Sequence, residues 1–219
     1  YYNMENLVES WKQLIEVRKQ THSWDMDREV SKQDIDDIFS ELHRRVPVKQ
    51  NRVHYKISVL DYSDPEFRDM YYNFCVDRDN PNPQYNPQVL APYLLVFSFR
   101  NPGEFDADFA VDRFGEYAKQ LSCIETGLAA DFIVHAAASR GLNCGFCRCY
   151  DDDFRPDQIA SKLGIDSVHD IIVSMGIGYA SEENKTLNPH TGKMVDSAHD
   201  QKWRTEPKPA MNDYIKFIE

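Results

Sequence analysis

Apolar residues near the start of the chain recur at intervals of three and four, which is the spacing of an amphipathic helix. They are Met4, Leu7, Val8, Trp11, Leu14 and Ile15. A second helix is predicted after Ser31, which suits the N-cap position, with Asp34 placed to complement the helix dipole. We expect it to end near Pro47 and to bury Ile35, Ile38, Phe39 and Leu42.

After Pro47 the spacing of the apolar residues changes from the helical period to the period of strands. Apolar residues Val53, Tyr55, Ile57 and Val59 alternate with polar ones, which predicts a half-buried strand. Compact apolar runs predict three further strands, at 93–99, 144–150 and 171–178.

The remaining segments are predicted from the positions of Pro, Gly and Asn residues, which interrupt helices and strands, and from local composition. We expect short helices at 65–76 and 156–163, a Pro/Asn-rich loop at 79–87, and a helix or several turns at 105–121. From residue 181 onward the chain is polar and has no strong period. We interpret this part as an extended tail that packs on other structure.

The segment 124–151, IETGLAADFIVHAAASRGLNCGFCRCYD, has the most distinctive pattern. It predicts one long, Ala-rich helix that ends at Gly141 and leads directly into a strand. Its small residues would let another backbone or a flat ligand approach closely. A central core helix of any α/β protein has the same character, so the pattern alone leaves both interpretations open.

Composition narrows the classes of function. The 219 residues carry a formal net charge of −11, which argues against a nucleic-acid backbone as the main partner. No apolar run approaches the ~20 residues of a membrane span, and no signal peptide is visible. The five cysteines are an odd number, and three of them crowd into one segment. We therefore expect a cytoplasmic, reducing compartment and no disulfide framework.

Familiar catalytic and nucleotide-binding motifs are missing from the sequence. Cys144, Cys147 and Cys149 could suggest a metal site, but no second Cys or His pair completes a zinc set. Buried cysteines are the preferred interpretation, with Cys147 and Cys149 on the same side of a strand. Dispersed basic and amide residues remain, and singly each would be read as solvated surface: Arg18, Lys19, Gln20, His22, Asn51, Lys202 and Arg204.

In their order along the chain, these pieces resemble the nitroreductase family of FMN-dependent oxidoreductases. That family carries R-x-S-x-(R/K)-x-(F/W), matched here by residues 18–24, and P-S-x-x-N, matched by residues 47–51. The remaining matches are the Ala91-Pro92 strand, the segment 124–151, the Met175–Tyr179 strand end and the basic pair Lys202 and Arg204.

The resemblance implies an α+β fold in which helices flank a central mixed sheet. It implies one domain over residues 1–219, in an intertwined homodimer with two FMN sites and with residues 181–219 packed on the dimer. Arg18, Lys202 and Arg204 would hold the FMN phosphate, with Lys19 in the same cofactor-binding segment. Gln20 and His22 would face the ribityl chain and the pyrimidine.

Other parts of the same implied site come from further along the chain. Pro47, Val48, Lys49 and Asn51 would belong to the partner subunit. Arg148 and Cys149 would lie near flavin N5, and Gln84 or Asn86 near the pyrimidine edge. FMN would carry the chemistry, so no catalytic side chain and no metal is expected.

The chain departs from the family pattern at four positions. Gln20 replaces a serine, His22 a basic residue, Val48 a hydroxyl and Arg148 an acidic residue. We expect electrons to pass from NADH or NADPH through FMN to a nitroaromatic, quinone or flavin. The departures also fit a degenerate member that binds flavin or a partner without turnover. A specialised reaction, such as reductive dehalogenation or flavin fragmentation, is a third alternative.

Overall fold

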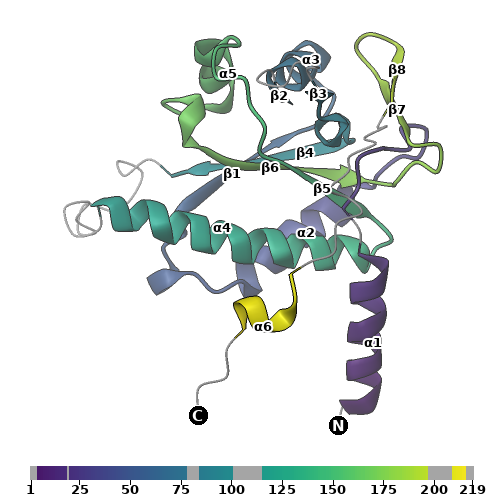
Figure 1. The fold of residues 1–219 in the computed structure, drawn as a ribbon, viewed down its shortest axis with the longest axis vertical. Coiled ribbons are helices and arrows are strands. Elements are labelled where there is room, and N and C mark those ends of the chain that lie inside the picture. Colours follow the sequence, from purple (N-terminus) through teal and green to yellow (C-terminus); the bar gives the residue numbers. More distant parts are fainter. Residues whose placement is uncertain (1–3, 19, 78–83, 101–114, 197–208, 216–219) are drawn as a thin grey trace.

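A computed structural model describes residues 4–18, 20–77, 84–100, 115–196 and 209–215. Its centre is a four-stranded sheet with the order β1 (Tyr55–Leu60), β4 (Tyr93–Phe99), β6 (Ile171–Gly178), β5 (Asn143–Cys147). Every pairing within this sheet is antiparallel, and the parallel component is a single bridge from Gln20 to Cys144 beside β5. Helices flank both faces, which confirms the α+β prediction (Figure 1).

The two faces of the sheet carry different layers (Figure 1). The long helix α4 (Gly115–Ala138) and α2 (Lys32–Arg45) cover one face. The helices α3 (Pro65–Phe74) and α5 (Pro156–Leu163) cover the other face. The predicted N-cap of α2 is confirmed, since the Ser31 side chain accepts a hydrogen bond from Asp34 N.

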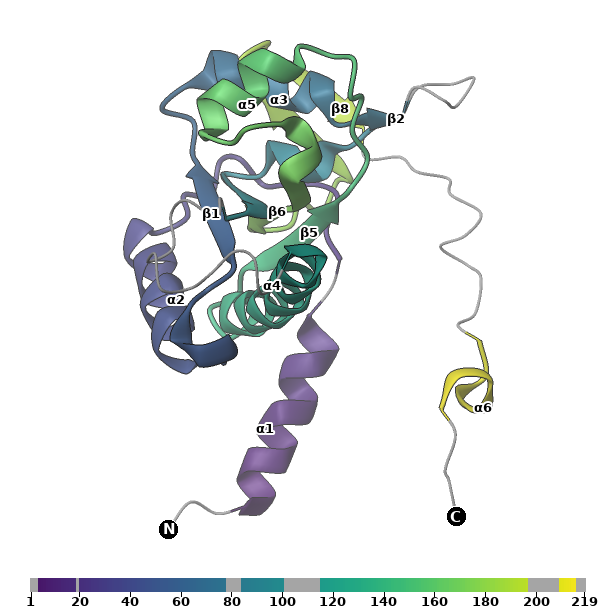
Figure 2. The same cartoon turned by 90° about the vertical axis from the view of Figure 1, so that its left-hand side faces the viewer.

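The helix α1 (Met4–Val17) projects away from this body (Figure 2). Its helical period was expected to bury one apolar face. Instead several of its apolar residues are exposed: Leu7, Val8, Trp11, Ile15 and Val17. Within the described part of the chain, α1 borders the end of α2 and contacts the C-terminal end of α4. The Trp11 and His135 rings provide that contact, with centroids 4.8 Å apart. The short helix α6 (Met211–Tyr214) also stands apart from the body (Figure 2).

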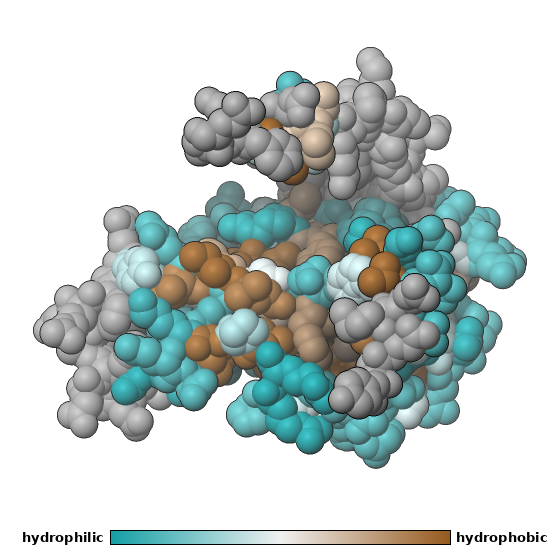
Figure 3. Space-filling model, turned by 90° about the horizontal axis from the view of Figure 1, so that it is seen from below, coloured by the Kyte–Doolittle hydropathy of each residue, from teal (hydrophilic) through white to brown (hydrophobic). Residues whose placement is uncertain are grey.

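The helix α4 has one buried face and one exposed apolar face. Ala129, Ile133 and Ala137 are buried, whereas Ile124 and Leu128 are 59% and 45% exposed. Apolar side chains form a band across the underside of the molecule (Figure 3). By length and composition α4 could cross a membrane, but half of its apolar stretch is buried inside the chain, as in the core helix of many globular proteins.

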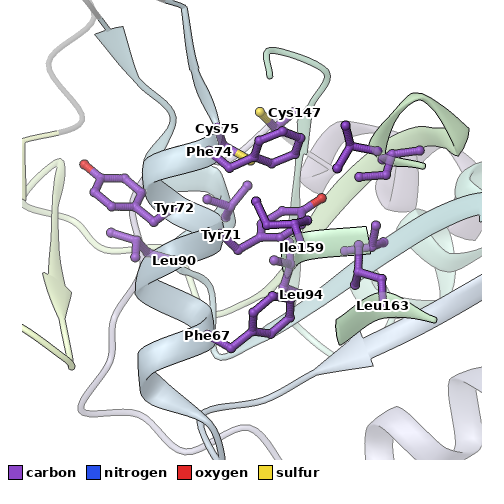
Figure 4. Close-up of a cluster of buried hydrophobic side chains, with 14 of the residues drawn as sticks. Phe67, Tyr71, Tyr72, Phe74, Cys75, Leu90, Leu94, Cys147, Ile159 and Leu163 are labelled. Carbon is purple, nitrogen blue, oxygen red and sulfur yellow. The ribbon is translucent and has the colours of Figure 1, made fainter. Parts of the chain in front are cut away.

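Two apolar cores hold the layers together. Ile38, Leu95 and Ile133 belong to the core between the sheet and the helices α2 and α4. The second core joins α3 and α5 to the other face of the sheet, where aromatic rings gather (Figure 4). In it the Phe74 and Tyr150 rings stack at 5.0 Å.

Two strand predictions need correction. The strand predicted over 144–150 ends at Cys147, so Arg148 and Cys149 lie beyond it. Consequently Cys147 is buried and Cys149 exposed, and the two do not share a strand face. In β1 the predicted alternation also fails at Val59, which is 44% exposed because β1 is an edge strand of the sheet.

The segment after residue 181, expected to be extended, forms a hairpin of β7 (Lys185–Asn188) and β8 (Lys193–Asp196). Its inner side chains are tied to the body: Thr186 Oγ1 accepts from Trp24 N at 2.8 Å, and Asn188 Nδ2 donates to Asp69 Oδ1 at 3.0 Å. A second short pair joins β2 (Val76–Asp77) to β3 (Gln84–Tyr85). Residues 101–114 lie outside the described residues, so only the last turns of the helix predicted over 105–121 are seen, as the start of α4.

Candidate functional site

The first part of the candidate site is the outer edge of β5. The Gln20 side-chain amide donates to Phe146 O at 3.0 Å and accepts from Phe146 N at 3.1 Å. The Thr21 amide donates to Cys144 O at 2.9 Å. Gln20 and Thr21 therefore follow the edge of β5 as a partial fifth strand, which explains the glutamine. A serine at position 20 is too short to span both groups of the Phe146 peptide.

Gly145 is required by this close approach. A Cβ atom at position 145 would lie 2.0 Å from Thr21 O, which is far inside any real contact. Trp24 holds the other end of the same segment: its indole Nε1 donates to Pro87 O at 3.0 Å and to Gln88 O at 3.2 Å. The segment 20–24 is thus fixed to β5 at one end and to the turn Pro87–Leu90 at the other.

Sequence reasoning missed Gln88, whose side chain lies against β5. Its side chain is 5% exposed, and its Nε2 donates to Phe146 O at 3.4 Å. Its Oε1 is buried and has no hydrogen-bond partner among the residues that the structure describes. A buried acceptor without a donor is costly. The signal in the sequence was one amide directly before the apolar run VLAPYLLVF.

Several predicted residues do gather near β5. Arg18 is exposed, and its charge acts on the neighbouring Cys144. Burial raises the pKa of the Cys144 thiol to about 12, and the Arg18 charge opposes that rise. His22 is half-buried between Thr21 and Ser23. Arg148 and Cys149 follow β5 and are exposed, with the Arg148 guanidinium 5.4 Å from the centre of the Tyr150 ring.

Asn86 is directed elsewhere, since its side-chain Nδ2 donates to Cys75 O at 2.8 Å. Gln84 belongs to β3, and its side chain lies outside the described part of the chain. Lys19, Lys202 and Arg204 also lie outside the described residues. Their assignments stay predictions.

The second part of the candidate site lies at the opposite edge of the sheet. Pro47, Val48, Lys49 and Asn51 precede β1, whereas Gln20 pairs with β5, and the order of the strands puts β1 and β5 at the two edges. Pro47, Lys49 and Asn51 are exposed and Val48 is half-buried. One chain therefore does not bring the two predicted groups together.

A groove of about 580 Å³ opens beside Pro47, between α1, the end of α2 and α4. Trp11, Leu14, Leu128 and Phe132 give it an apolar lining, and Asp131, His135 and Arg140 add polar groups. It opens on the same face as the exposed side chains of α4. Within the described ranges, no group of three or more His, Cys, Asp or Glu side chains is placed to hold a metal ion.

Comparisons with known proteins agree with the resemblance. The model of the nitroreductase family matches residues 15–179. No curated protein shows a significant match. Among solved structures, the Bacillus subtilis protein ydfN, assigned as a nitroreductase, has a TM-score of 0.67 at 13% identity, covering 96% of this chain and 100% of its own.

Two further structures are similar. A Staphylococcus epidermidis protein assigned as an NAD(P)H:FMN oxidoreductase has a TM-score of 0.64 at 15% identity, with 95% of each chain covered. Nitroreductase A from Vibrio parahaemolyticus has a TM-score of 0.58 at 18% identity, covering 78% of this chain and 68% of its own. At these identities the likeness shows a shared fold.

Proposed function

Because the chain belongs to the nitroreductase family of flavin oxidoreductases, we propose that it binds FMN at the edge of β5 and oxidises NADH or NADPH. The observation that carries this proposal is the convergence of distant segments. Gln20 and Phe146 are 126 positions apart, and their pairing brings Gln20 and Thr21 against β5, which ends directly before Arg148 and Cys149. The resemblance assigned these same segments to the flavin.

The residues present fit such a cofactor. Arg18, whose charge acts on Cys144 of β5, and Arg148, which follows the end of β5, are exposed cations of the kind that an anionic phosphate and a reduced flavin need. The buried Gln88 Oε1 lacks a donor, and a pyrimidine N–H is a donor of the right kind. When bound, FMN supplies the transfer of a hydride and of electrons to a small flat acceptor. The protein's share is binding, orientation and electrostatics.

The proposal includes a homodimer. The exposed apolar side chains of α1 and α4 and the groove beside Pro47 form a surface of the kind that a second copy covers. In such a pair, residues 47–51 of one chain could reach the β5 edge of the other, which a single chain does not allow. This surface and the opposite placement of the two groups support the dimer.

The test is spectroscopic. Protein reconstituted with FMN should retain a yellow flavin spectrum after gel filtration, and anaerobic NADPH or NADH should bleach it. The two nicotinamides are compared side by side, because the acidic surface of the chain does not discriminate between them. A colourless product that takes up no FMN would overturn the proposal.

One observation favours a second candidate function, a flavin-binding or interaction protein without turnover. The Gln20 amide, assigned to the ribityl chain, already has both of its polar atoms on the Phe146 backbone. The neighbouring His22 stands where the family pattern has a basic residue. This candidate predicts FMN binding without anaerobic bleaching, so the same assay separates the two.

A further inference from the structure

The loop that precedes β1 has an unusual backbone. Gln50, Asn51 and Val53 have φ values of 55°, 58° and 44°, although none of them is glycine. The left-handed region is unfavourable for side chains, most of all for a β-branched residue such as valine. Three such residues within four positions do not persist unless the surrounding structure holds them.

A single carboxylate on α4 holds both ends of this loop. Glu125 Oε1 accepts from Lys49 N at 2.8 Å, and Oε2 accepts from His54 N at 2.8 Å. The His54 Nδ1 atom lies 2.9 Å from Oε1. One turn earlier on α4, Ser122 Oγ donates to His54 O. One turn of the helix thus fixes the loop at its first and last residues.

Burial of the Glu125 carboxylate costs free energy of folding unless hydrogen-bond partners compensate for the lost water. Its side chain is 3% exposed, and a buried carboxylate requires close hydrogen-bond partners. Its contacts engage the loop backbone and His54, and they leave the side chains of Lys49 and Asn51 on the surface. Ile124 and Leu128, on the same stretch of helix, are exposed on the outer face of α4.

We propose that Glu125 is a positioning residue, which holds the segment 47–51 in the conformation that contacts FMN in a second copy of the chain. The inference rests on the proposed function. Glu125 would thus link two parts of the molecule through one turn of α4. One is the outer face of α4, where the second copy would pack, and the other is the segment 47–51. The loop and the interface helix would then move as one unit.

Glu125→Gln is the sharpest variant because the change is isosteric. The carboxylate accepts from two backbone N–H groups through different oxygens, whereas an amide has one oxygen. In either orientation the amide NH2 group faces a backbone N–H, of Lys49 or of His54. We expect hydrogen exchange at these two amides to accelerate about tenfold and the Kd for FMN to rise about tenfold, while the dimer persists in sedimentation.

Glu182→Gln is the matched control, since it removes one exposed carboxylate far from the loop in sequence. It should change neither readout. If Glu125→Gln does not fold, Ser122→Ala takes its place, because it removes one bond to His54 without opposing two donors. The same changes are then expected at a smaller size, about threefold.

The outcomes separate the two proposals. A wild-type chain that binds no FMN overturns the proposed function, and with it the role assigned to Glu125. A wild-type chain that binds FMN, with a variant that loosens the loop but keeps the Kd within twofold, overturns only the positioning role. Unchanged exchange at Lys49 and His54 overturns it as well.

Discussion

The side-chain amide of Gln20 pairs with the peptide group of Phe146 through both of its polar atoms, at 3.0 and 3.1 Å. It thereby takes the place of a backbone peptide on the edge of β5. We expect Gln20→Ala to lower the free energy of unfolding by about 1 kcal/mol, as for two partly solvated hydrogen bonds. Urea unfolding measures this, and Gln158→Ala, on the exposed side of α5, should have almost no effect.

Gly145→Ala tests the close approach of Thr21 to β5. The new methyl group would lie 2.0 Å from Thr21 O, so the segment 20–24 must leave the strand. A loss of about 3 kcal/mol or more is expected in thermal or urea unfolding. Gly164→Ala is the control, because its cost is backbone strain at a φ of 64°, about 1 kcal/mol, and the new methyl group would make only an ordinary contact with Lys56 Nζ at 3.6 Å. Equal losses at the two positions would contradict the steric explanation.

Gln88→Leu separates cofactor binding from stability. The variant removes a buried acceptor that has no donor in the described structure, together with a long bond of 3.4 Å to Phe146 O. The free energy of unfolding without FMN should therefore stay within about 1 kcal/mol of the wild type. The Kd for FMN, measured by fluorescence quenching, should rise about tenfold if Gln88 accepts from the flavin. An unchanged Kd would remove Gln88 from the site.

Leu128→Glu tests the dimer. Leu128 is 45% exposed on α4 and lines the groove beside Pro47, so a second copy packed there would bury the new charge. Sedimentation at micromolar concentration should show a monomer, while the helical circular dichroism of the chain persists. Gln158→Glu on α5 adds the same charge at an exposed position on the other side of the sheet, and it serves as the control. A variant that sediments like the wild type would exclude this face as the interface.

Stability should fall in alkaline solution because of buried thiol and phenol groups. Burial raises the pKa of Cys144 from 9.0 to about 12 and that of Tyr55 from 10.0 to about 12. Between these values the unfolded chain releases the proton and the folded chain keeps it. The contribution of Cys144 is therefore complete below pH 9 and that of Tyr55 below pH 10, and each declines as the pH rises toward 12, by at most about 1.4 kcal/mol per pH unit.

Cys144→Ala isolates the thiol in that decline. The variant loses some packing at every pH, but its unfolding free energy should fall less steeply than that of the wild type between pH 9 and pH 10. Urea titrations at half-unit pH intervals measure the two slopes. Parallel slopes would show that another group controls the alkaline transition.

Local pattern was sufficient for much of the fold. The second helix could be predicted because its cap at Ser31 and its apolar spacing agree, and β4 and β6 because they are buried on both faces. The hairpin β7–β8 could not, because four-residue strands contain too few alternations to show a period. The end of β5 at Cys147 depends on its neighbours, which the sequence does not display.

The candidate site was harder to predict for the same physical reason. The segments around Gln20 and Arg148 could be proposed from a family resemblance. The bond between Gln20 and Phe146 could not, since it joins residues 126 positions apart. In the sequence, Gln88 and Glu125 look like ordinary polar residues next to apolar ones. Only their burial and their partners show that the first lacks a donor and that the second restrains a strained loop.

The partial strand formed by Gln20 and Thr21 also bears on solubility. A free sheet edge is a template on which another chain can add a strand, and such growth leads to aggregates. At β5 the groups of Phe146 are already engaged, and the group that engages them is a side chain. A side-chain amide ends at its own nitrogen and presents no further peptide on its outer side. At Phe146 the edge is thus protected without a new peptide edge being created, so we expect replacement of Gln20 to increase precipitation during expression.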